Sequence, residues 1–387
     1  MKKISLVLVG ASGLVAAPCH LNAIAGVDSI ELVGICDSNV EPLARLAEQY
    51  SAPHIYANLE QVLLDKQVDA VDLVVPPALH YDFAIAAANA GKHVYVEKPM
   101  AHTVGQAGAM IAAAESAGVT LMVGESYWFH SPHQRAAELI ADGEVGDVLQ
   151  VRQTKGPWLF TSEEDERLGG KGHDVAWRHD PEASGGGAFP WMMDHGCHLF
   201  ATARLLAGNQ PIECVNALSR QHGLAGDRDL RGITALTWNY EGDTADGVWT
   251  QTEHGPAAGP YVGFRSEVIG TKGSLLVFGE GGGAAPGFPD LAPVTLLQDG
   301  DMISYDIDET PDRAWQSNNN YYDQAHQNTL SEFAAACIEK RAPAYSAADG
   351  LHDLTATLAV IRSASEGRAI TLAQMQDDWR AAVVDDG

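Results

Sequence analysis

The sequence is poor in basic residues. Its 387 residues include 24 lysines and arginines against 51 aspartates and glutamates, which gives a formal net charge of −27. Nucleic-acid phosphates and anionic membranes are bound by basic patches, which this charge balance disfavours. The chain also lacks an apolar run of the roughly 18 residues that a membrane-spanning helix requires. The sequence therefore argues against these partners and predicts a cytoplasmic protein with a small-molecule substrate.

Cysteine is also scarce, and no two cysteines form a CxxC pair. The five are Cys19, Cys36, Cys197, Cys214 and Cys337. This scatter predicts reduced thiols, and it argues against a disulfide framework or a zinc site. His173, Asp174 and His179 lie close together but lack a metal-ligand spacing, so no metal is expected.

The amino terminus allows two interpretations. Lys2-Lys3 followed by ISLVLVGASGLVAA and Cys19 resembles a signal peptide or lipoprotein leader. The same residues can form a buried strand, KISLVLVG, that runs into a glycine turn. The elements that follow need a first strand, so we expect the strand.

Up to about residue 125, short apolar runs alternate with helical patterns. Expected strands lie at 3–10, 30–37, 70–76, 94–96 and 119–124, and expected helices at 14–25, 40–50, 58–68, 79–91 and 103–117. This alternation predicts an α/β fold with a doubly wound parallel sheet, the Rossmann arrangement, over residues 1–125.

The pattern changes after Glu125. Helices are expected at 132–142 and 188–207, and closely spaced strands with short turns follow from about 211. That spacing is typical of a mostly antiparallel sheet. Residues 126–387 are therefore expected to form a second, α+β domain for substrate binding and oligomerisation. Its C-terminal helices, about 325–366, are candidates to pack back on the first domain.

The first strand and turn predict a dinucleotide site. Gly10 fits the first position of G-x-G-x-x-G, whereas Ser12 and Val15 replace the other two glycines. We expect Gly10, Ser12, Gly13 and Leu14 to face the pyrophosphate. Asp37 ends the next strand, where an acid accepts from a free ribose 2′-hydroxyl and repels a 2′-phosphate. NAD is therefore expected in preference to NADP.

Lys98 follows the strand VYV at 94–96 and precedes Pro99, so it is held at the carboxyl end of a parallel strand. Ligands of open α/β sheets bind at that edge. The alternative is a solvated lysine in a turn.

Several motifs together resemble the Gfo/Idh/MocA family of oxidoreductases. They are PPALH at 76–80, AGKHVYVEKP at 90–99, GEVGDV at 143–148, SGGGAFPWMMDHGCH at 184–198 and GTKGSL at 270–275. The resemblance runs nearly end to end and implies a Rossmann domain followed by a large open sheet. It implies cofactor contacts from Pro76, His80, Glu97 and Lys98, although Ala78 stands where the family usually has asparagine. It also implies that Lys98, Asp194 and His198 are the catalytic set.

Asp194 and His198 are four residues apart on an expected helix, so they share one face. Histidine can take a hydroxyl proton, aspartate can orient the imidazole, and lysine can stabilise a developing alkoxide. His195 is expected to point elsewhere on this helix. The alternative is an Asp–His pair on a solvated face. Candidate substrate-binding residues are Tyr127, His130, Trp177, Arg178 and His195.

These observations predict an NAD-dependent oxidoreductase acting on a secondary alcohol of a sugar, cyclitol or glycoside. The alternatives are a lyase or glycosidase that reduces NAD only transiently, and a non-catalytic NAD-bound regulator. The apolar runs ALTWNY at 235–240 and GVWTQ at 247–251 predict a sheet face that packs on a partner, giving a homodimer or homotetramer.

Overall fold

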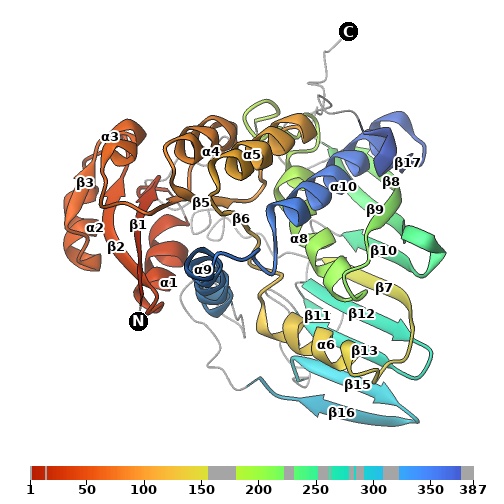
Figure 1. The fold of residues 1–387 in the computed structure, drawn as a ribbon. Helices are drawn as coiled ribbons and strands as arrows, with labels where there is room; N and C mark the ends of the chain where they lie inside the picture. The colour runs from red at the N-terminus through yellow and green to blue at the C-terminus, as the bar shows by residue number, and fades with distance from the viewer. Residues whose placement is uncertain are drawn as a thin grey trace.

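The computed structural model describes residues 2–13, 15–155, 180–221, 231–251, 261–262, 264–278, 283–284, 292–307 and 322–375. Figure 1 shows two sheets side by side, each with its own helices, in one continuous body.

The first sheet has six parallel strands in the order β3-β2-β1-β4-β5-β6. Its strands are β1 (Ile4–Val9), β2 (Ile30–Cys36), β3 (His54–Tyr56), β4 (Ala70–Leu73), β5 (His93–Glu97) and β6 (Leu121–Gly124). Strands β4 and β6 are buried along their whole length, and β1 is buried at every residue except Ser5, as expected for a sheet covered on both faces. The chain order reverses between β1 and β4, which creates the crevice where such sheets bind ligands.

Helices cover both faces of this sheet (Figure 1). They are the π-helix η1 (Ala16–Leu21), α1 (Asn22–Ala25), α2 (Leu43–Tyr50), α3 (Leu59–Leu64), the short 3₁₀ helix η2 (Pro77–Leu79), α4 (His80–Asn89) and α5 (Val104–Ala117). Helix α4 packs on β4 and β5 beside α5. The Thr103 side chain caps α5 by accepting from the backbone N–H of Gln106.

The second sheet has nine strands among the described residues, in the order β16-β15-β13-β12-β7-β10-β9-β8-β17. Their bounds are β7 (Val148–Lys155), β8 (Ile212–Gln221), β9 (Arg231–Tyr240), β10 (Asp246–Gln251), β12 (Phe264–Gly270), β13 (Ser274–Phe278), β15 (Val294–Gln298), β16 (Asp301–Tyr305) and β17 (Ile370–Thr371). Two short strands, β11 (Tyr261–Val262) and β14 (Gly283–Ala284), pair separately. All neighbours in the large sheet are antiparallel except β7 and β10, which are parallel.

Helices α6 (Ser131–Ala141), α8 (Pro190–Leu205) and α10 (Ala347–Glu366) pack on one face of this sheet. The ring of Trp238 on β9 packs edge to face against the ring of Phe200 on α8, with ring centroids 5.8 Å apart. The Tyr240 hydroxyl donates a hydrogen bond to the backbone oxygen of Ala203. The aromatic side chains of the two runs at 235–240 and 247–251 therefore face helices of the same chain. The prediction that these two apolar runs form a sheet face packed on a partner subunit is therefore wrong. On the opposite face, Leu218 is exposed.

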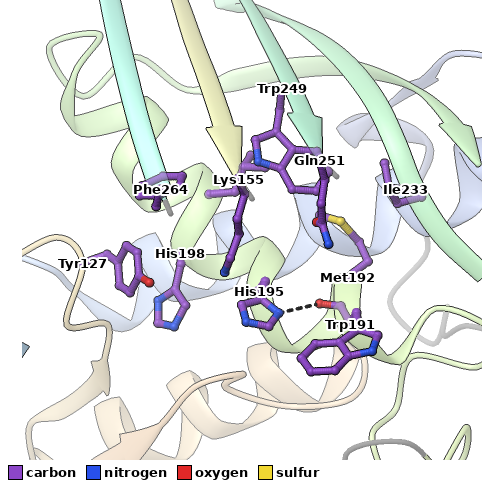
Figure 2. A pocket seen from close by; sticks show the side chains of 11 residues that line it. Tyr127, Lys155, Trp191, Met192, His195, His198, Ile233, Trp249, Gln251 and Phe264 are labelled. Carbon is purple, nitrogen blue, oxygen red and sulfur yellow. Dashed lines mark hydrogen bonds between the residues drawn. The ribbon is translucent and has the colours of Figure 1, made fainter. Parts of the chain in front are cut away.

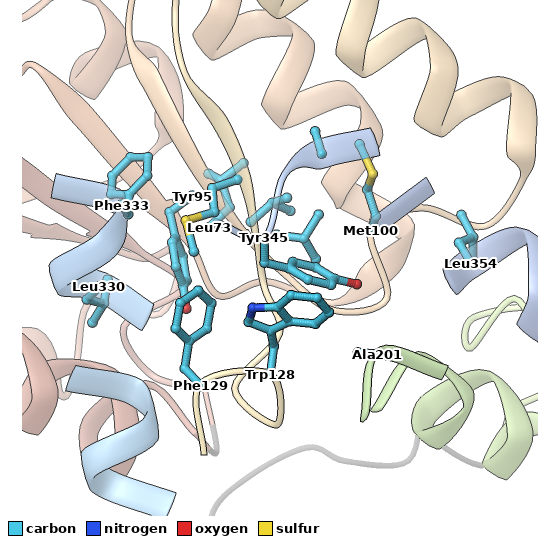
Figure 3. Close-up of a cluster of buried hydrophobic side chains, with 14 of the residues drawn as sticks. Leu73, Tyr95, Met100, Trp128, Phe129, Ala201, Leu330, Phe333, Tyr345 and Leu354 are labelled. Carbon is cyan, nitrogen blue, oxygen red and sulfur yellow. The ribbon is translucent and has the colours of Figure 1, made fainter. Parts of the chain in front are cut away.

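A hydrophobic cluster joins the two halves (Figure 3). Tyr95 of β5 meets Phe333 of α9 (Tyr322–Glu339) with ring centroids 5.5 Å apart. Trp128, just after β6, meets Tyr345 before α10 at 5.3 Å. Helix α9 also packs on β1 and β6, so both C-terminal helices contact the first sheet.

The architecture confirms the expected fold class, a parallel Rossmann sheet followed by a mixed, mostly antiparallel sheet. The sequence missed the short edge strands β3 and β17 and the hairpin β15–β16, which have little apolar alternation to reveal them. None of the five cysteines forms a disulfide. No helix in the described part of the chain is long and apolar enough to span a membrane.

Candidate active site

The turn after β1 is built around Gly10. Its φ of +93° suits glycine, and a Cβ there would lie 2.2 Å from the Val74 carbonyl oxygen. The Gly13 N–H donates to the Gly10 oxygen over 3.0 Å, which closes the turn. Leu14 lies outside the described residues. The helix that follows opens as a π-helix, a feature that the sequence did not predict.

Asp37 reaches across this turn. Its Oδ2 accepts from both the backbone N–H and the hydroxyl of Ser12, at 2.8 and 2.7 Å. The predicted ribose ligand and the predicted phosphate ligand are thus in direct contact. A carboxylate in this position disfavours a further phosphate.

These residues fit a dinucleotide. The turn offers backbone N–H groups and a hydroxyl beside a helix start, and the carboxylate of Asp37 stands at the end of the neighbouring strand. Gly10, Ser12 and Gly13 would hold the phosphates and Asp37 the ribose. Pro76 is exposed at the start of η2.

His80 does not reach this surface. It is fully buried, and its ring nitrogens lie 2.8 Å from the Pro99 oxygen and 2.9 Å from the Val75 oxygen. Burial lowers the pKa of His80, so the ring is neutral and donates to one of these carbonyls at a time. Its position links the loop after β4 to the loop that carries Lys98.

Below the Lys98 loop, a buried histidine lies between two carboxylates. His20 Nδ1 is 2.8 Å from Asp72 Oδ2, and His20 Nε2 is 3.1 Å from Glu97 Oε1. Burial alone would lower the pKa of His20, but Asp72 and Glu97 raise it to about 10. Burial alone would raise the pKa of Glu97, but His20 and Lys98 lower it to about 2. The predicted cofactor residue Glu97 is therefore an anion held by an imidazolium.

His20, Glu97 and His326 of α9 place one ligand atom each within 4.8 Å of one another, close enough to hold a cation. The charged hydrogen bonds of His20 account for this arrangement without one. Glu97 also accepts from the backbone N–H of Lys98 at 3.1 Å, so the network fixes the backbone that presents that lysine.

Lys98 and Asp194 meet across the two domains. Lys98 Nζ donates to Asp194 Oδ1 at 2.9 Å and to the Asp194 backbone oxygen at 3.1 Å. Asp194 and His198 are only 8% and 5% exposed, which rules out the solvated-face alternative. Gly185 helps to seat α8, since a Cβ there would lie 2.5 Å from the His102 ring.

His198 has a different partner from the one predicted. Its Nδ1 lies 2.6 Å from Oε1 of Glu125, the residue that follows β6, while Asp194 pairs with Lys98. The expectation that Asp194 orients this imidazole is therefore wrong, because a lysine amine competes for the aspartate from the neighbouring domain. Burial lowers the pKa of His198 well below the usual range, and Lys98 and Lys155 lower it further.

Tyr127 completes the setting of His198. Its ring stacks on the imidazole with centroids 4.1 Å apart, and its backbone N–H donates to Glu125 Oε1 at 3.0 Å. His130 is buried, 6.3 Å from the Tyr127 ring, and is not among the residues that line the pocket described next.

A pocket opens over α8 beneath the second sheet (Figure 2). It is lined by Tyr127, Lys155, Trp191, Met192, His195, His198, Leu199, Ile233, Trp249, Gln251 and Phe264. His195 lines it together with His198, because residues three apart on a helix lie about 60° apart around the axis. The expectation that His195 points elsewhere is therefore wrong.

The polar groups of this pocket come from opposite walls. Lys155, at the end of β7, is buried and points toward His195 and His198 (Figure 2). His195 Nδ1 donates to the backbone oxygen of Trp191 at 3.1 Å, and the imidazole of His195 stacks on the indole of Trp191 with ring centroids 5.3 Å apart. Its Nε2 is then an acceptor. Indole faces, an amine and imidazoles suit a ring that carries hydroxyl groups.

Trp177 and Arg178 lie outside the described residues. Sequence reasoning missed His20, Glu125 and Lys155. Glu125 carried a signal, because it directly follows a buried strand of the parallel sheet, like Lys98. Lys155 ends an alternating strand, where only the tertiary structure shows which face is covered.

Two family models match the chain. One, described as an oxidoreductase family with an NAD-binding Rossmann fold (GFO_IDH_MocA), matches residues 4–125. The other, the GFO/IDH/MocA C-terminal domain, matches residues 133–276. Together they cover more than half of the chain.

Curated relatives and solved structures agree with these matches. D-xylose 1-dehydrogenase (NADP(+)) 2 of Haloferax volcanii is 35% identical over 178 residues, 46% of this chain and about half, 50%, of that protein. 1,5-anhydro-D-fructose reductase of Ensifer adhaerens is 26% identical over 94% of this chain and 96% of its own length. The crystal structure of aldose-aldose oxidoreductase from Caulobacter crescentus, complexed with glycerol, has a TM-score of 0.75 at 26% identity, covering 96% of this chain and 100% of that one.

Proposed function

Because the chain belongs to the Gfo/Idh/MocA family of oxidoreductases, we propose that it oxidises a secondary alcohol of a sugar, cyclitol or glycoside, or catalyses the reverse reduction, with NAD. The observation that carries the proposal is the convergence of Lys98, Asp194 and His198. Lys98 follows β5 at the carboxyl edge of the parallel sheet and pairs with Asp194 of α8, the helix whose His198 lines the pocket.

Bound NAD would supply the hydride acceptor. Lys98, held by Asp194, would donate to the reacting oxygen and stabilise the alkoxide that develops there. His198 would take the hydroxyl proton at Nε2, because its Nδ1 already faces Glu125. Lys155 and His195 would bind neighbouring hydroxyls, and Trp191 or Trp249 would pack on the ring.

Cofactor choice is part of this proposal. Asp37 stands over the turn and favours NAD over NADP. The xylose dehydrogenase relative uses NADP by its name, so the family contains both preferences.

We further propose that residues 1–125 and 126–387 act as cofactor and substrate domains, and that the open face of the second sheet pairs with a second copy to form a homodimer or homotetramer. Leu218 on that face is 66% exposed, which suits an interface. A sedimentation mass near the 41.2 kDa monomer at micromolar concentration would contradict the assembly.

The test of the reaction is a spectrophotometric screen of sugars, cyclitols and glycosides with NAD. We expect net NADH formation with at least one substrate, and Lys98→Met should reduce its rate about 10²-fold or more. Lys66→Met, an exposed lysine on the Rossmann domain, is the matched control. Product formation without net NADH would favour the transient-redox lyase or glycosidase, and NAD binding without turnover would favour a regulator.

A further inference from the structure

Glu125 and His198 form a buried pair that has few other partners. Glu125 is fully buried, and its Oε1 lies 2.6 Å from His198 Nδ1. The same oxygen accepts the Tyr127 N–H at 3.0 Å, but Oε2 has no hydrogen-bond partner among the described residues. A buried carboxylate with one unsatisfied oxygen is costly as an anion, so this group favours a proton.

The titratable and charged groups around the pair come from both domains. They are Tyr95, Glu97 and Lys98 at β5, His130 and His133 at α6, Lys155 on β7, Asp194, His195 and Cys197 on α8, and Tyr345 and Asp353 at α10. Burial raises the pKa of Glu125 well above the usual range, although Lys98 and Lys155 act against it. The same burial lowers the pKa of His198. A second proton on this pair therefore resides on the glutamate.

We propose that Glu125 is a positioning residue that takes over, through His198, the proton released by the substrate, so that the imidazole stays neutral throughout the reaction. The proposal rests on the proposed function, since it assigns the fate of the proton in that oxidation. It differs from the usual role of a carboxylate behind a catalytic histidine, which remains ionised and stabilises an imidazolium.

In the reactive state Glu125 is a carboxylate, His198 carries its proton on Nδ1, and Nε2 has the free electron pair. The substrate O–H bond breaks as its proton binds Nε2, and the Nδ1 proton passes to Glu125 Oε1. The pair changes from a charge of −1 to 0, and His198 ends as the other neutral tautomer.

This tautomer exchange is measurable without substrate or cofactor. We expect ¹⁵N NMR of histidine-labelled protein to show His198 protonated on Nε2 at low pH and on Nδ1 at high pH, without an imidazolium at either limit. Isotope-edited infrared spectra should show a protonated glutamate carboxyl that ionises at the same midpoint. An ordinary imidazole-to-imidazolium titration of His198 with Glu125 ionised throughout would overturn the proposal.

Glu125→Gln keeps the size of the side chain but cannot take a proton. We expect the infrared band and the tautomer exchange to disappear in this variant, while Glu115→Gln on the exposed face of α5 keeps both. Exchange that persists in Glu125→Gln would contradict the assignment. If that variant does not fold, the wild-type spectra decide the question alone.

Kinetics supply the second readout. With a substrate found by the screen, kcat of the wild type should rise with pH as Glu125 ionises in the enzyme–substrate complex. In Glu125→Gln, kcat should fall about 10²-fold and lose that rise, while KM changes less than threefold. A loss in KM alone would mean a structural role. If no substrate is oxidised, the proposed function fails, and the spectroscopic outcome still stands or falls separately.

Discussion

His20 and His198 are both buried and both hydrogen-bonded to carboxylates, but they behave in opposite ways. His20 lies between Asp72 and Glu97, and its pKa is raised to about 10. His198 has one carboxylate partner, Glu125, and its pKa is lowered. The difference lies in the neighbours, because two carboxylates outweigh burial at His20, whereas Lys98 and Lys155 add to burial at His198. Burial of a histidine beside an acid therefore does not predict its charge. The charged one supports a loop, and the neutral one is available as a base.

The largest expected effect is the loss of turnover when the neutral histidine, His198, is replaced. His198→Asn should reduce turnover by about 10²–10⁴-fold, because it removes the proposed proton acceptor. NAD affinity should be retained, since no cofactor contact is assigned to His198. Steady-state kinetics and cofactor titration in parallel measure both quantities, and the exposed His54→Gln is the control. Near-normal turnover would mean that another group, such as His195, takes the proton.

Replacing the charged histidine, His20, should reduce the stability of the fold. His20→Gln removes the cation between the buried Asp72 and the half-buried Glu97 and should lower the free energy of unfolding by about 3–5 kcal/mol near pH 6. The pKa of His20 rises from 6.5 to about 10 on folding, so its contribution is full below pH 6.5 and is lost as the pH rises through 10. Denaturant unfolding at pH 6 and pH 10 should show the difference from wild type shrinking. An equal difference at both values would contradict a charged His20.

Substitution of Lys155 tests whether its positive charge contributes to keeping His198 neutral. In Lys155→Met the pKa of both His198 and Glu125 should rise, because a nearby cation is lost. The increase of kcat with pH should therefore shift to higher pH, and KM should rise roughly tenfold with the loss of a substrate contact, about 1.4 kcal/mol. Lys66→Met should leave the profile unchanged. An unshifted profile would show that burial alone sets the protonation of the pair.

The smallest effect concerns the cofactor end of the same crevice. Asp37→Asn keeps the hydrogen bonds to Ser12 but removes the charge, so NADP should gain about tenfold in affinity relative to NAD. Fluorescence titration with both cofactors measures the ratio, and the exposed Asp28→Asn is the control. A wild-type preference for NADP would overturn the assignment of Asp37.

Local sequence patterns were enough to predict the fold class and many residues of the candidate site. Alternating apolar runs and helical spacings determined the parallel sheet, and the glycine turn, Asp37 and Lys98 follow from the ends of its strands. The pair Asp194 and His198 followed from helical spacing, which places side chains on a face without naming their partners. These features depend on residues close together in the chain, so the sequence alone carries them.

The pairing of the charges was decided only by the tertiary structure. Lys98 and Asp194 are 96 residues apart and Glu125 and His198 are 73 apart, so no local spacing connects them. Asp194 is near His198 in sequence, but its carboxylate forms an ion pair with Lys98 of the other domain. The burial that lowers the pKa of His198 comes from β7, α6 and α10 packing over α8. The sequence determined which chemical groups are present near the crevice, and long-range packing decided their partners and their protonation.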